Sequence, residues 1–165
     1  MTTRPIRLFG DPILNTAAAP VERFDAPLSA LAADMLETMA EAGGVGLAAN
    51  QVGVAKRIFV YSCQGMTGAL INPVWRPLGK GTQTGVEGCL SIPEQYADVT
   101  RPKQVRLQWM GLDGKTHEEE FDGLWATCAQ HELDHLNGVL FIDHLSLLKR
   151  NMILRKLAKT RRARA

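Results

Sequence analysis

Long hydrophobic runs are absent from this sequence of 165 residues. None approaches the ~20 consecutive apolar residues that a membrane-spanning helix requires. The first residues, MTTRPIRLFGDP, have neither the apolar core of a secretory signal nor the long Arg- and Ser-rich composition of a transit peptide. We therefore expect a cytoplasmic protein that has no membrane partner.

Cysteine is scarce as well. The sequence has 3 cysteines, which form no CxxC pair and lie far apart: Cys63, Cys89 and Cys128. An odd number at such spacing argues against a disulfide framework and favours free thiols in a reducing compartment.

The remaining composition is ordinary for a globular protein, with 45% apolar and 22% charged residues. At this length we expect one domain over residues 1–165, large enough to bury a hydrophobic core. Acidic residues are absent from residues 149–165, where eight of the 19 basic residues lie, so the rest of the chain has 11 basic against 17 acidic residues. A basic tail on an acidic body indicates a polyanionic partner for the tail.

Apolar periodicity predicts helices near both ends of the chain and strands between them. Helices are expected over 27–42, 123–137 and 146–160, and extended segments over 57–61, 69–75, 86–93, 105–109 and 116–121. Asp122 is a candidate N-cap and Asn137-Gly138 a candidate stop for the second helix. This order of elements predicts an α+β fold in which antiparallel β-sheets pack around the helix at 123–137, with a further helix at the C-terminus.

The string QHELDHLNG, residues 130–138, carries the strongest chemical signal. His131 and His135 are four residues apart in the predicted helix, so both imidazoles lie on one face and can bind the same metal ion. Glu132 lies between them and can reach a water at that ion as a general base. The alternative is a solvated helix face with histidines by chance, but the sequence has only 4 histidines. We therefore predict a metal-binding helix.

Two histidines do not complete a zinc- or iron-type site, so a third ligand is needed. In the protease pattern HExxHxxGxxH the last position falls on Phe141, and no glutamate follows Glu132 to serve as the downstream ligand of another protease class. Asp143 and His144 remain candidates, although they lie beyond the predicted end of the helix. A cysteine thiolate from upstream is the stronger candidate.

The three cysteines differ in their suitability as a ligand. Cys128 lies seven residues before His135, about 10.5 Å along a helix axis, which is too far for both to reach one ion easily. We expect Cys128 to be a small buried residue and Cys63, after a predicted strand, to lie in the core or at the surface. Cys89 lies in an extended segment beside Gly88, which lets the backbone approach a ligand closely. We select Cys89 as the third ligand.

The sequence contains three short motifs in this order: GVGLAANQ (44–51), EGCLS (87–91) and QHELDHLNG (130–138). Together they resemble the motifs of the peptide deformylase family, and in the first of them Gly46 through Ala49 and Gln51 match. The similarity continues through INPV (71–74), SIPEQ (91–95) and LFIDHL (140–145), and it is weakest in the first 40 residues and the final tail. Each motif alone is modest evidence, whereas the three together are highly specific.

The resemblance implies removal of the formyl group from the N-terminal formyl-methionine of nascent polypeptides, with release of formate. It places the metal ligands at Cys89, His131 and His135, with a water in the fourth position. Fe(II) is the usual native ion of the family, with zinc, nickel or cobalt as possible substitutes and one ion per chain. The metal-bound water is then the nucleophile, and Glu132 is the general base and acid.

The resemblance also assigns residues that bind the reacting amide and the peptide. The side-chain amide of Gln51 and the backbone N–H of Leu90 are expected to form an oxyanion hole. Backbone groups of Gly46 are expected to bind the peptide as an added strand. A pocket for the methionine side chain is expected from four residues: Val45, Leu124, Thr127 and Cys128.

Two positions depart from the family pattern, because Trp125 and Thr127 stand where many relatives carry aliphatic residues. They bear on the size of the methionine pocket, while the expected ligands, base and oxyanion donors are all present. Glu87 is expected to pair with Arg101 and to brace the segment that carries the cysteine.

The sequence disfavours two other functions. An inactive relative that binds formylated peptides or metal without turnover is disfavoured because Glu132 and Gln51 are both present. A general HExxH peptidase is disfavoured by the missing downstream ligand and by the EGCLS motif.

The basic C-terminus admits a nucleic-acid-binding module, although nothing indicates that nucleic acid is the substrate. Leu148, Met152 and Leu157 give the expected C-terminal helix part of an apolar stripe, which can dock on the body or on a partner. Our hypothesis is that residues 149–165 tether the protein to the ribosome, where nascent chains leave it.

Overall fold

The structure, a computed structural model, describes residues 2–164. Its α-helices are α1 (Ala26–Ala42), α2 (Gly123–Leu136) and α3 (Leu147–Arg164). Its strands are β1 (Gly46–Ala48), β2 (Ile58–Cys63), β3 (Met66–Pro77), β4 (Thr82–Cys89), β5 (Ile92–Pro102), β6 (Gln104–Met110) and β7 (Thr116–Asp122). Short 3-10 helices span Pro12–Asn15, Ala49–Val52 and Phe141–His144. The predicted domain and tail extend to Met1 and Ala165, which lie outside the described residues.

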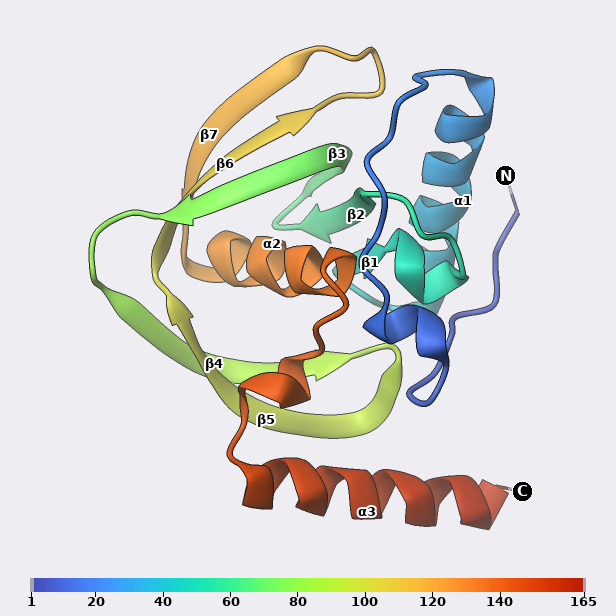
Figure 1. The fold of residues 1–165 in the computed structure, drawn as a ribbon, viewed down its shortest axis with the longest axis vertical. Coiled ribbons are helices and arrows are strands. Elements are labelled where there is room, and N and C mark those ends of the chain that lie inside the picture. The colour runs from blue at the N-terminus through green and yellow to red at the C-terminus, as the bar shows by residue number, and fades with distance from the viewer. Residues whose placement is uncertain (1, 165) are drawn as a thin grey trace.

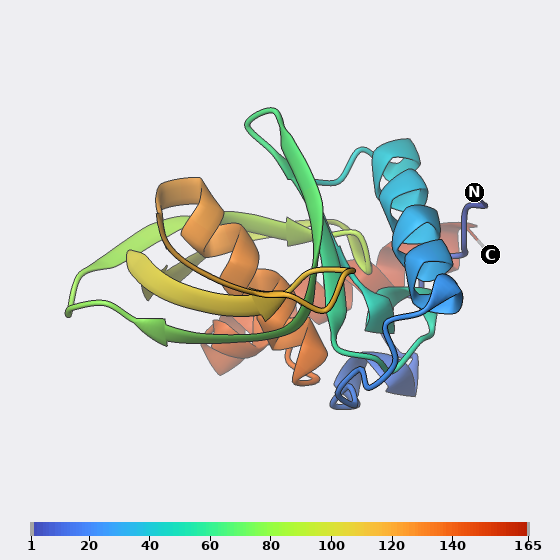
Figure 2. The same ribbon diagram turned by 90° about the horizontal axis from the view of Figure 1, so that it is seen from above.

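The strands form two antiparallel sheets around α2. In the described part of the chain, β1, β2, β3, β6 and β7 make a five-stranded sheet in that order, and β4 pairs with β5. Helix α2 lies between the five-stranded sheet and the β4–β5 hairpin, and α3 lies on the outer side of that hairpin (Figure 1). Figure 2 shows α1 and α2 on opposite sides of the β2–β3 hairpin. The predicted α+β fold is confirmed, and none of the helices described is long and apolar enough to cross a bilayer.

Helix α1 begins and ends close to the predicted positions. The Asp25 carboxylate accepts a hydrogen bond from the Leu28 N–H (3.2 Å), which caps the first turn. Gly43 ends the helix in the left-handed conformation (φ 72°). The apolar face of α1 packs against β1 and β2 in a buried cluster that includes Leu31, Met35, Met39, Leu47, Ile58 and Val60. This packing supports β1 from the side opposite to α2.

Helix α2 packs one face against the five-stranded sheet. The buried cluster between them includes Phe59, Leu70, Leu107, Ala129, Leu133 and Leu136. Asp122 is the N-cap of α2, as predicted, with extended backbone, although its side chain makes no capping hydrogen bond. The next residue, Gly123, has φ 56°, which turns the chain away from ordinary capping geometry. Gly138 (φ 76°) follows the helix, where a Cβ would lie 2.8 Å from the Asn15 backbone.

The segment 86–93, expected as one extended stretch, is the tip of a hairpin. Strand β4 ends at Cys89 and β5 begins at Ile92, with Leu90 and Ser91 in the turn between them. The pairing register shifts just before Cys89, which is an irregularity that periodicity alone does not reveal. The turn places Cys89 at the end of the hairpin that packs across α2.

Helix α3 docks on the body through Leu157, which belongs to the predicted stripe, and through Ile153, which does not. Ile153 and Leu157 are 7% and 3% exposed, in a cluster with the 3-10 helix that precedes α3. Leu148 and Met152 are 69% and 46% exposed, so the predicted stripe is wrong for both as a contact with the body. Helical spacing identifies residues that share a face, but the neighbouring element decides which face is buried.

Candidate metal centre

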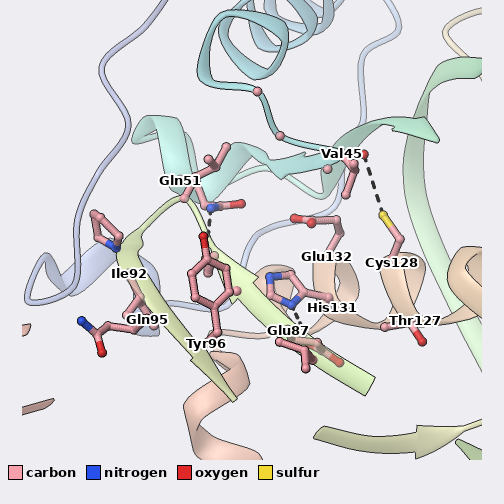
Figure 3. Close-up of a pocket in the computed structure, with 18 of the residues that line it drawn as sticks. Val45, Gln51, Glu87, Ile92, Gln95, Tyr96, Thr127, Cys128, His131 and Glu132 are labelled. Atoms are coloured by element: carbon pink, nitrogen blue, oxygen red, sulfur yellow. Dashed lines mark hydrogen bonds and ion pairs between the residues drawn. The ribbon is translucent and has the colours of Figure 1, made fainter. Parts of the chain in front are cut away.

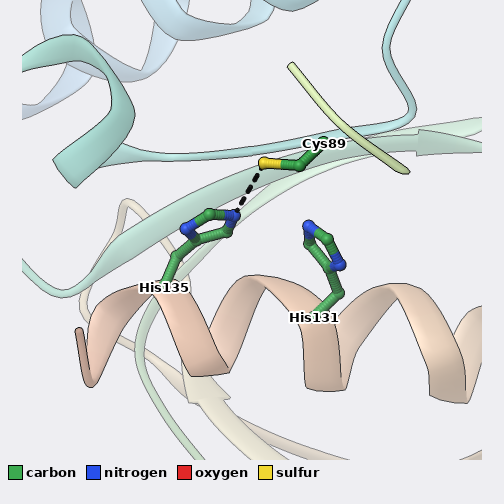
Figure 4. Close-up of side chains that lie close together, drawn as sticks. All are labelled: Cys89, His131 and His135. Atoms are coloured by element: carbon green, nitrogen blue, oxygen red, sulfur yellow. Dashed lines mark hydrogen bonds between the residues drawn. The ribbon is translucent and has the colours of Figure 1, made fainter. Parts of the chain in front are cut away.

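Three side chains selected from the sequence meet at one point (Figure 4). The Cys89 sulfur and one ring nitrogen each of His131 and His135 lie within 4.8 Å of one another. The Cys89 Sγ is 3.3 Å from His135 Nε2. Bonds of about 2.3 Å to sulfur and about 2.0–2.1 Å to nitrogen place these atoms about 3.5 Å apart around a tetrahedral ion. The donor atoms and their spacing therefore fit one first-row metal ion.

Helix α2 and the end of strand β4 bring these ligands together. His131 and His135 project from one face of α2, and their ring centroids are 5.0 Å apart. Cys89, the last residue of β4, approaches them from the hairpin. A Cβ at Gly88 would lie 2.5 Å from the Tyr96 ring. The glycine therefore makes room for Tyr96, which is a different reason from the close ligand approach expected from the sequence.

A buried ion-pair network orients His131. The Nδ1 atom of His131 lies 2.9 Å from the Glu87 carboxylate, which also accepts hydrogen bonds of 2.6 and 2.9 Å from Arg101. Arg101 donates a further bond to Asp134 (2.8 Å). Because Nδ1 donates its hydrogen bond to the carboxylate, Nε2 is the ring nitrogen of His131 that is left for a metal ion, which binds it once its proton is displaced. The predicted Glu87–Arg101 pair is confirmed, and its contact with His131 is a role that the sequence did not reveal.

Burial and charge set the protonation of this network. Burial opposes ionisation of Glu87, but Arg101 and His131 outweigh it and lower its pKa to about 2. Burial also opposes a charged His131, yet the hydrogen bonds to Cys89 and Glu87 raise its pKa well above the ordinary value. Burial lowers the pKa of His135 well below the ordinary value. Glu87 therefore stays ionised, and His135 is in the neutral form that a metal ligand requires.

Glu132 is a buried carboxylate with a free oxygen beside the ligands. It is 4% exposed, and its Oε1 atom has no hydrogen-bond partner among the residues described. Burial raises the pKa of Glu132 to about 7, which suits a group that takes and releases a proton near neutral pH. A Cβ at Gly46 of β1 would lie 2.5 Å from Glu132 Oε2. The missing side chain at Gly46 therefore leaves room for the carboxylate.

Gln51 is held next to the cysteine by its own side-chain hydrogen bonds. The Ala48 N–H donates to Gln51 Oε1 (3.0 Å), which fixes the orientation of the amide. The Nε2 atom donates to Ser91 Oγ (3.1 Å) and lies 3.5 Å from Cys89 Sγ. The amide N–H groups therefore point toward the turn of the hairpin, beside the metal ligands.

A pocket of about 460 Å³ opens at this site (Figure 3). All five predicted substrate-binding residues line it: Val45, Gly46, Leu124, Thr127 and Cys128. The predicted catalytic residues also line it, together with two of the ligands: Gln51, Leu90, Glu132, Cys89 and His131. Val45 and Leu124 are 52% and 54% exposed, so the pocket has an apolar mouth that a bound molecule can cover.

Trp125 lies outside this pocket. Its ring contacts Tyr61 (4.8 Å between centroids) and Phe121 (5.7 Å), and the three line a second cavity with residues of the sheet. The expectation that Trp125 affects the methionine pocket is therefore wrong, because adjacent helix positions project in different directions. Thr127 does line the pocket, and its hydroxyl accepts a hydrogen bond from Gln83 (2.8 Å).

The other thiols are buried away from the ligand cluster. Cys63 is 4% exposed in β2, and burial raises its pKa. Cys128 is 8% exposed, its sulfur lies 3.8 Å from the Val45 carbonyl oxygen, and burial strongly raises its pKa. Both therefore remain protonated thiols, as their predicted packing roles imply.

Asp143 and His144 belong to the 3-10 helix that follows α2. The Asp143 carboxylate accepts a hydrogen bond from the Leu140 N–H (2.9 Å), and His144 Nε2 lies 2.7 Å from Asp134. Neither residue is part of the cluster around Cys89. They serve local structure at the surface, which excludes them as the third ligand.

Two residues of the site were missed in the sequence, Ser91 and Asp134. Ser91 accepts a hydrogen bond from the side-chain amide of Gln51, which lies 40 positions earlier in the sequence. Asp134 accepts one from Arg101, which lies 33 positions earlier. Ser91 stands in EGCLS and Asp134 in QHELDHLNG, so their place within these motifs was the available signal. Their partners depend on the tertiary fold.

Two imidazoles one helical turn apart, a cysteine ligand and a buried carboxylate beside an open pocket are typical of metal-dependent hydrolases. The family model of polypeptide deformylase matches residues 3–151. A peptide deformylase 1 of Corynebacterium efficiens is 50% identical over 154 residues, which cover 91% of each chain. The chain therefore belongs to the polypeptide deformylase family, a family of hydrolases, as the resemblance predicted.

Other relatives agree with this assignment over nearly the whole chain. The peptide deformylase of Rhizorhabdus wittichii is 49% identical over 174 residues, covering 99% of this chain and 98% of its own. The crystal structure of a peptide deformylase from Legionella pneumophila superimposes with a TM-score of 0.93 at 42% identity, covering 99% of this chain and 98% of that one. The fold is thus that of the family.

Proposed function

We propose that this protein removes the formyl group from the N-terminal formyl-methionine of nascent polypeptides and releases formate, acting as one domain in the cytoplasm. The observation that carries the proposal is the buried Glu132 carboxylate, with a free oxygen, in the same pocket as the cysteine–histidine cluster. Relatives about half identical to this chain are named peptide deformylases, which supports the same reaction.

Cys89, His131 and His135 would hold one divalent ion. Iron(II) is the proposed native ion, and zinc, nickel or cobalt suit the same sulfur and nitrogen donors. When bound, the ion would act as a Lewis acid and would lower the pKa of a water molecule at its open coordination position. The Glu87 carboxylate would hold the ring of His131 in the orientation that binding requires.

Glu132 is the proposed proton carrier of the reaction. Its free oxygen accepts the proton of the water that attacks the formyl carbon, and the same carboxyl group then delivers the proton to the departing amine. The pKa of about 7 suits both steps, because neither protonation state is strongly favoured near neutral pH. The Gln51 amide and the Leu90 backbone N–H would donate to the formyl oxygen as negative charge develops on it.

The peptide would bind along β1. Within residues 2–164 only β2 pairs with this edge strand, so its second edge can pair with an extended peptide. Gly46 would supply backbone hydrogen bonds there. The methionine side chain would enter the pocket beside the exposed Val45 and Leu124, with Thr127 and Cys128 on the turns of α2 behind them.

The test of the proposal compares a formyl-Met peptide with its unformylated counterpart. Metal-loaded protein prepared without air should release formate from the first and leave the peptide bonds of both intact. Cleavage of peptide bonds would instead indicate a general peptidase. Binding of the formyl peptide without formate release by fully loaded protein would indicate an inactive relative.

The change Gln51→Ala is expected to lower kcat for deformylation by about 10²–10³-fold, because one oxyanion donor is lost. Steady-state formate release by the metal-loaded variant measures the effect. The matched control is Gln83→Ala, because Gln83 donates to Thr127 at the pocket wall, away from the ligands. An unchanged kcat in Gln51→Ala would rule out its role as an oxyanion donor.

We further propose that the basic face of α3 binds the ribosome. Arg155, Lys159 and Arg162 are exposed and share one face of the helix, while the buried Ile153 and Leu157 hold the helix on the body. Deletion of 149–165 would remove these buried contacts as well as the charges. Charge reversal of the three exposed residues therefore tests the charges alone.

The triple variant Arg155→Glu, Lys159→Glu and Arg162→Glu is expected to lose co-sedimentation with ribosomes while keeping formate release from a short peptide. Reversal of three exposed lysines on the body serves as the control: Lys80, Lys103 and Lys115. Binding of wild-type protein should weaken as salt rises, because cations that neutralise phosphates release counterions. Unchanged co-sedimentation of the α3 variant would contradict the ribosome proposal.

A further inference from the structure

A second cavity, of about 260 Å³, lies between α2 and the inner face of the five-stranded sheet. Its deep part is formed by Phe59, Leu70 and Leu107, which are 1%, 4% and 1% exposed. Its lining residues come from α2 and from the strands of the sheet that lies above this helix in Figure 1. The metal ligands and Glu132 do not line this cavity, so it is separate from the proposed active site.

Four aromatic rings form the walls of this cavity: Tyr61, Trp109, Phe121 and Trp125. Trp125 lies edge-on to Tyr61, with centroids 4.8 Å apart, and stacks with Phe121 at 5.7 Å. Trp109 lies 6.0 Å from Phe121. All four are only partly buried, so ring surface remains accessible to a small ligand.

The charge of the cavity has one sign. Its lining includes Glu119, Glu120 and Asp122, and no lysine or arginine. Arg106 pairs with Glu118 and Glu120, whereas Glu119 forms no ion pair within residues 2–164. Burial and the negative charge of Glu119 raise the pKa of Tyr61, which places this carboxylate next to the aromatic wall.

We propose that this cavity binds a small organic cation, with an ammonium-type head group on a short apolar stem. Aromatic ring faces attract a cation through their quadrupoles, most strongly for tryptophan, and a nearby carboxylate adds to the attraction. A neutral apolar ligand would fill the same space, with Glu119 still solvated at the exposed edge, but it would gain no attraction from this carboxylate or from the ring quadrupoles. The combination of rings and a free carboxylate therefore selects for positive charge.

The cavity is independent of the deformylation proposal. Cys128 borders both hollows, and its thiol contacts the Val45 carbonyl oxygen on the side of the catalytic pocket. Apart from Cys128, the two hollows share no lining residue. The cation is therefore a ligand in addition to the peptide, and binding can be measured whether or not the protein turns over a formyl peptide.

The test compares choline with its neutral isostere 3,3-dimethylbutan-1-ol, by calorimetric titration of metal-loaded protein. Choline is expected to bind with a millimolar dissociation constant, and the isostere about tenfold less tightly because it lacks the charge. Quenching or shift of the tryptophan fluorescence by choline should saturate at the same concentrations. Equal binding of the two compounds, or no saturable binding of choline in the millimolar range, would overturn the proposal.

Two pairs of variants locate the site. Glu119→Gln should weaken choline binding about fivefold, whereas Glu118→Gln, on the other face of β7, should leave it unchanged. Trp125→Leu should remove binding, while Trp75→Leu, at a ring outside the cavity lining, should not. Far-ultraviolet circular dichroism and metal content show that each variant is folded. Wild-type affinity in Glu119→Gln or in Trp125→Leu would place the cation elsewhere and overturn the assignment.

Discussion

Replacement of Glu132 with glutamine is expected to lower kcat for deformylation by about 10²–10⁴-fold, the range over which a general base contributes. The amide has nearly the shape of the carboxylate, so it fits the space beside Gly46, where a side chain would lie 2.5 Å from the native group. It cannot accept the proton of the attacking water. Formate release by variant and wild-type protein at equal metal loading measures the loss.

Metal content separates this effect from damage to the site. Glu132 is not part of the cysteine–histidine cluster, so Glu132→Gln should keep one ion per chain. The control is Glu118→Gln, because Glu118 is an exposed carboxylate on β7 that bonds to Arg106. Its rate should match the wild type. Near-wild-type turnover in Glu132→Gln would exclude the residue as the base, and loss of the ion together with the activity would make it a metal ligand.

The histidines and the carboxylate of α2 could be predicted because their geometry is local. Spacing of four residues brings His131 and His135 onto one face in any helix, whatever surrounds it. Cys89 required a longer inference, since it lies on another element: it was selected for its extended segment and its neighbour Gly88, and the turn that follows it was not predicted. Their meeting point is now observed, while their roles in the reaction stay predictions.

The contacts that the sequence did not reveal are those set by tertiary packing. The pairing of β4 with β5 brings Glu87 and Arg101 together, and the packing of α2 against this hairpin adds His131. The same limit explains the exposed Leu148 and Met152, because their periodicity marks a helix face and not its neighbour. Spacing within a helix therefore predicts which residues share a face, whereas tertiary packing determines which residues of different elements come into contact.

The change Cys89→Ala is expected to remove the metal ion and, with it, the activity. His131 and His135 would remain as two ligands, whereas sites of this kind use three from the protein. Loss of a residue that only orients a ligand costs about 10–100-fold in metal affinity, so loss of the sulfur ligand should cost more than about 100-fold. Zinc bound per chain after equilibrium dialysis measures the affinity, and formate release measures the activity.

Thermal unfolding of the same protein gives an independent measure of this site. An ion that binds only the native state raises the Tm, so zinc should stabilise the wild type and have little effect on Cys89→Ala. Cys63→Ala is the matched control, because Cys63 is a buried thiol of β2 outside the cluster. It should keep the zinc-dependent rise in Tm. Wild-type zinc affinity in Cys89→Ala would show that the sulfur is not a ligand, and the proposed hydrolysis would then lose the site on which it depends.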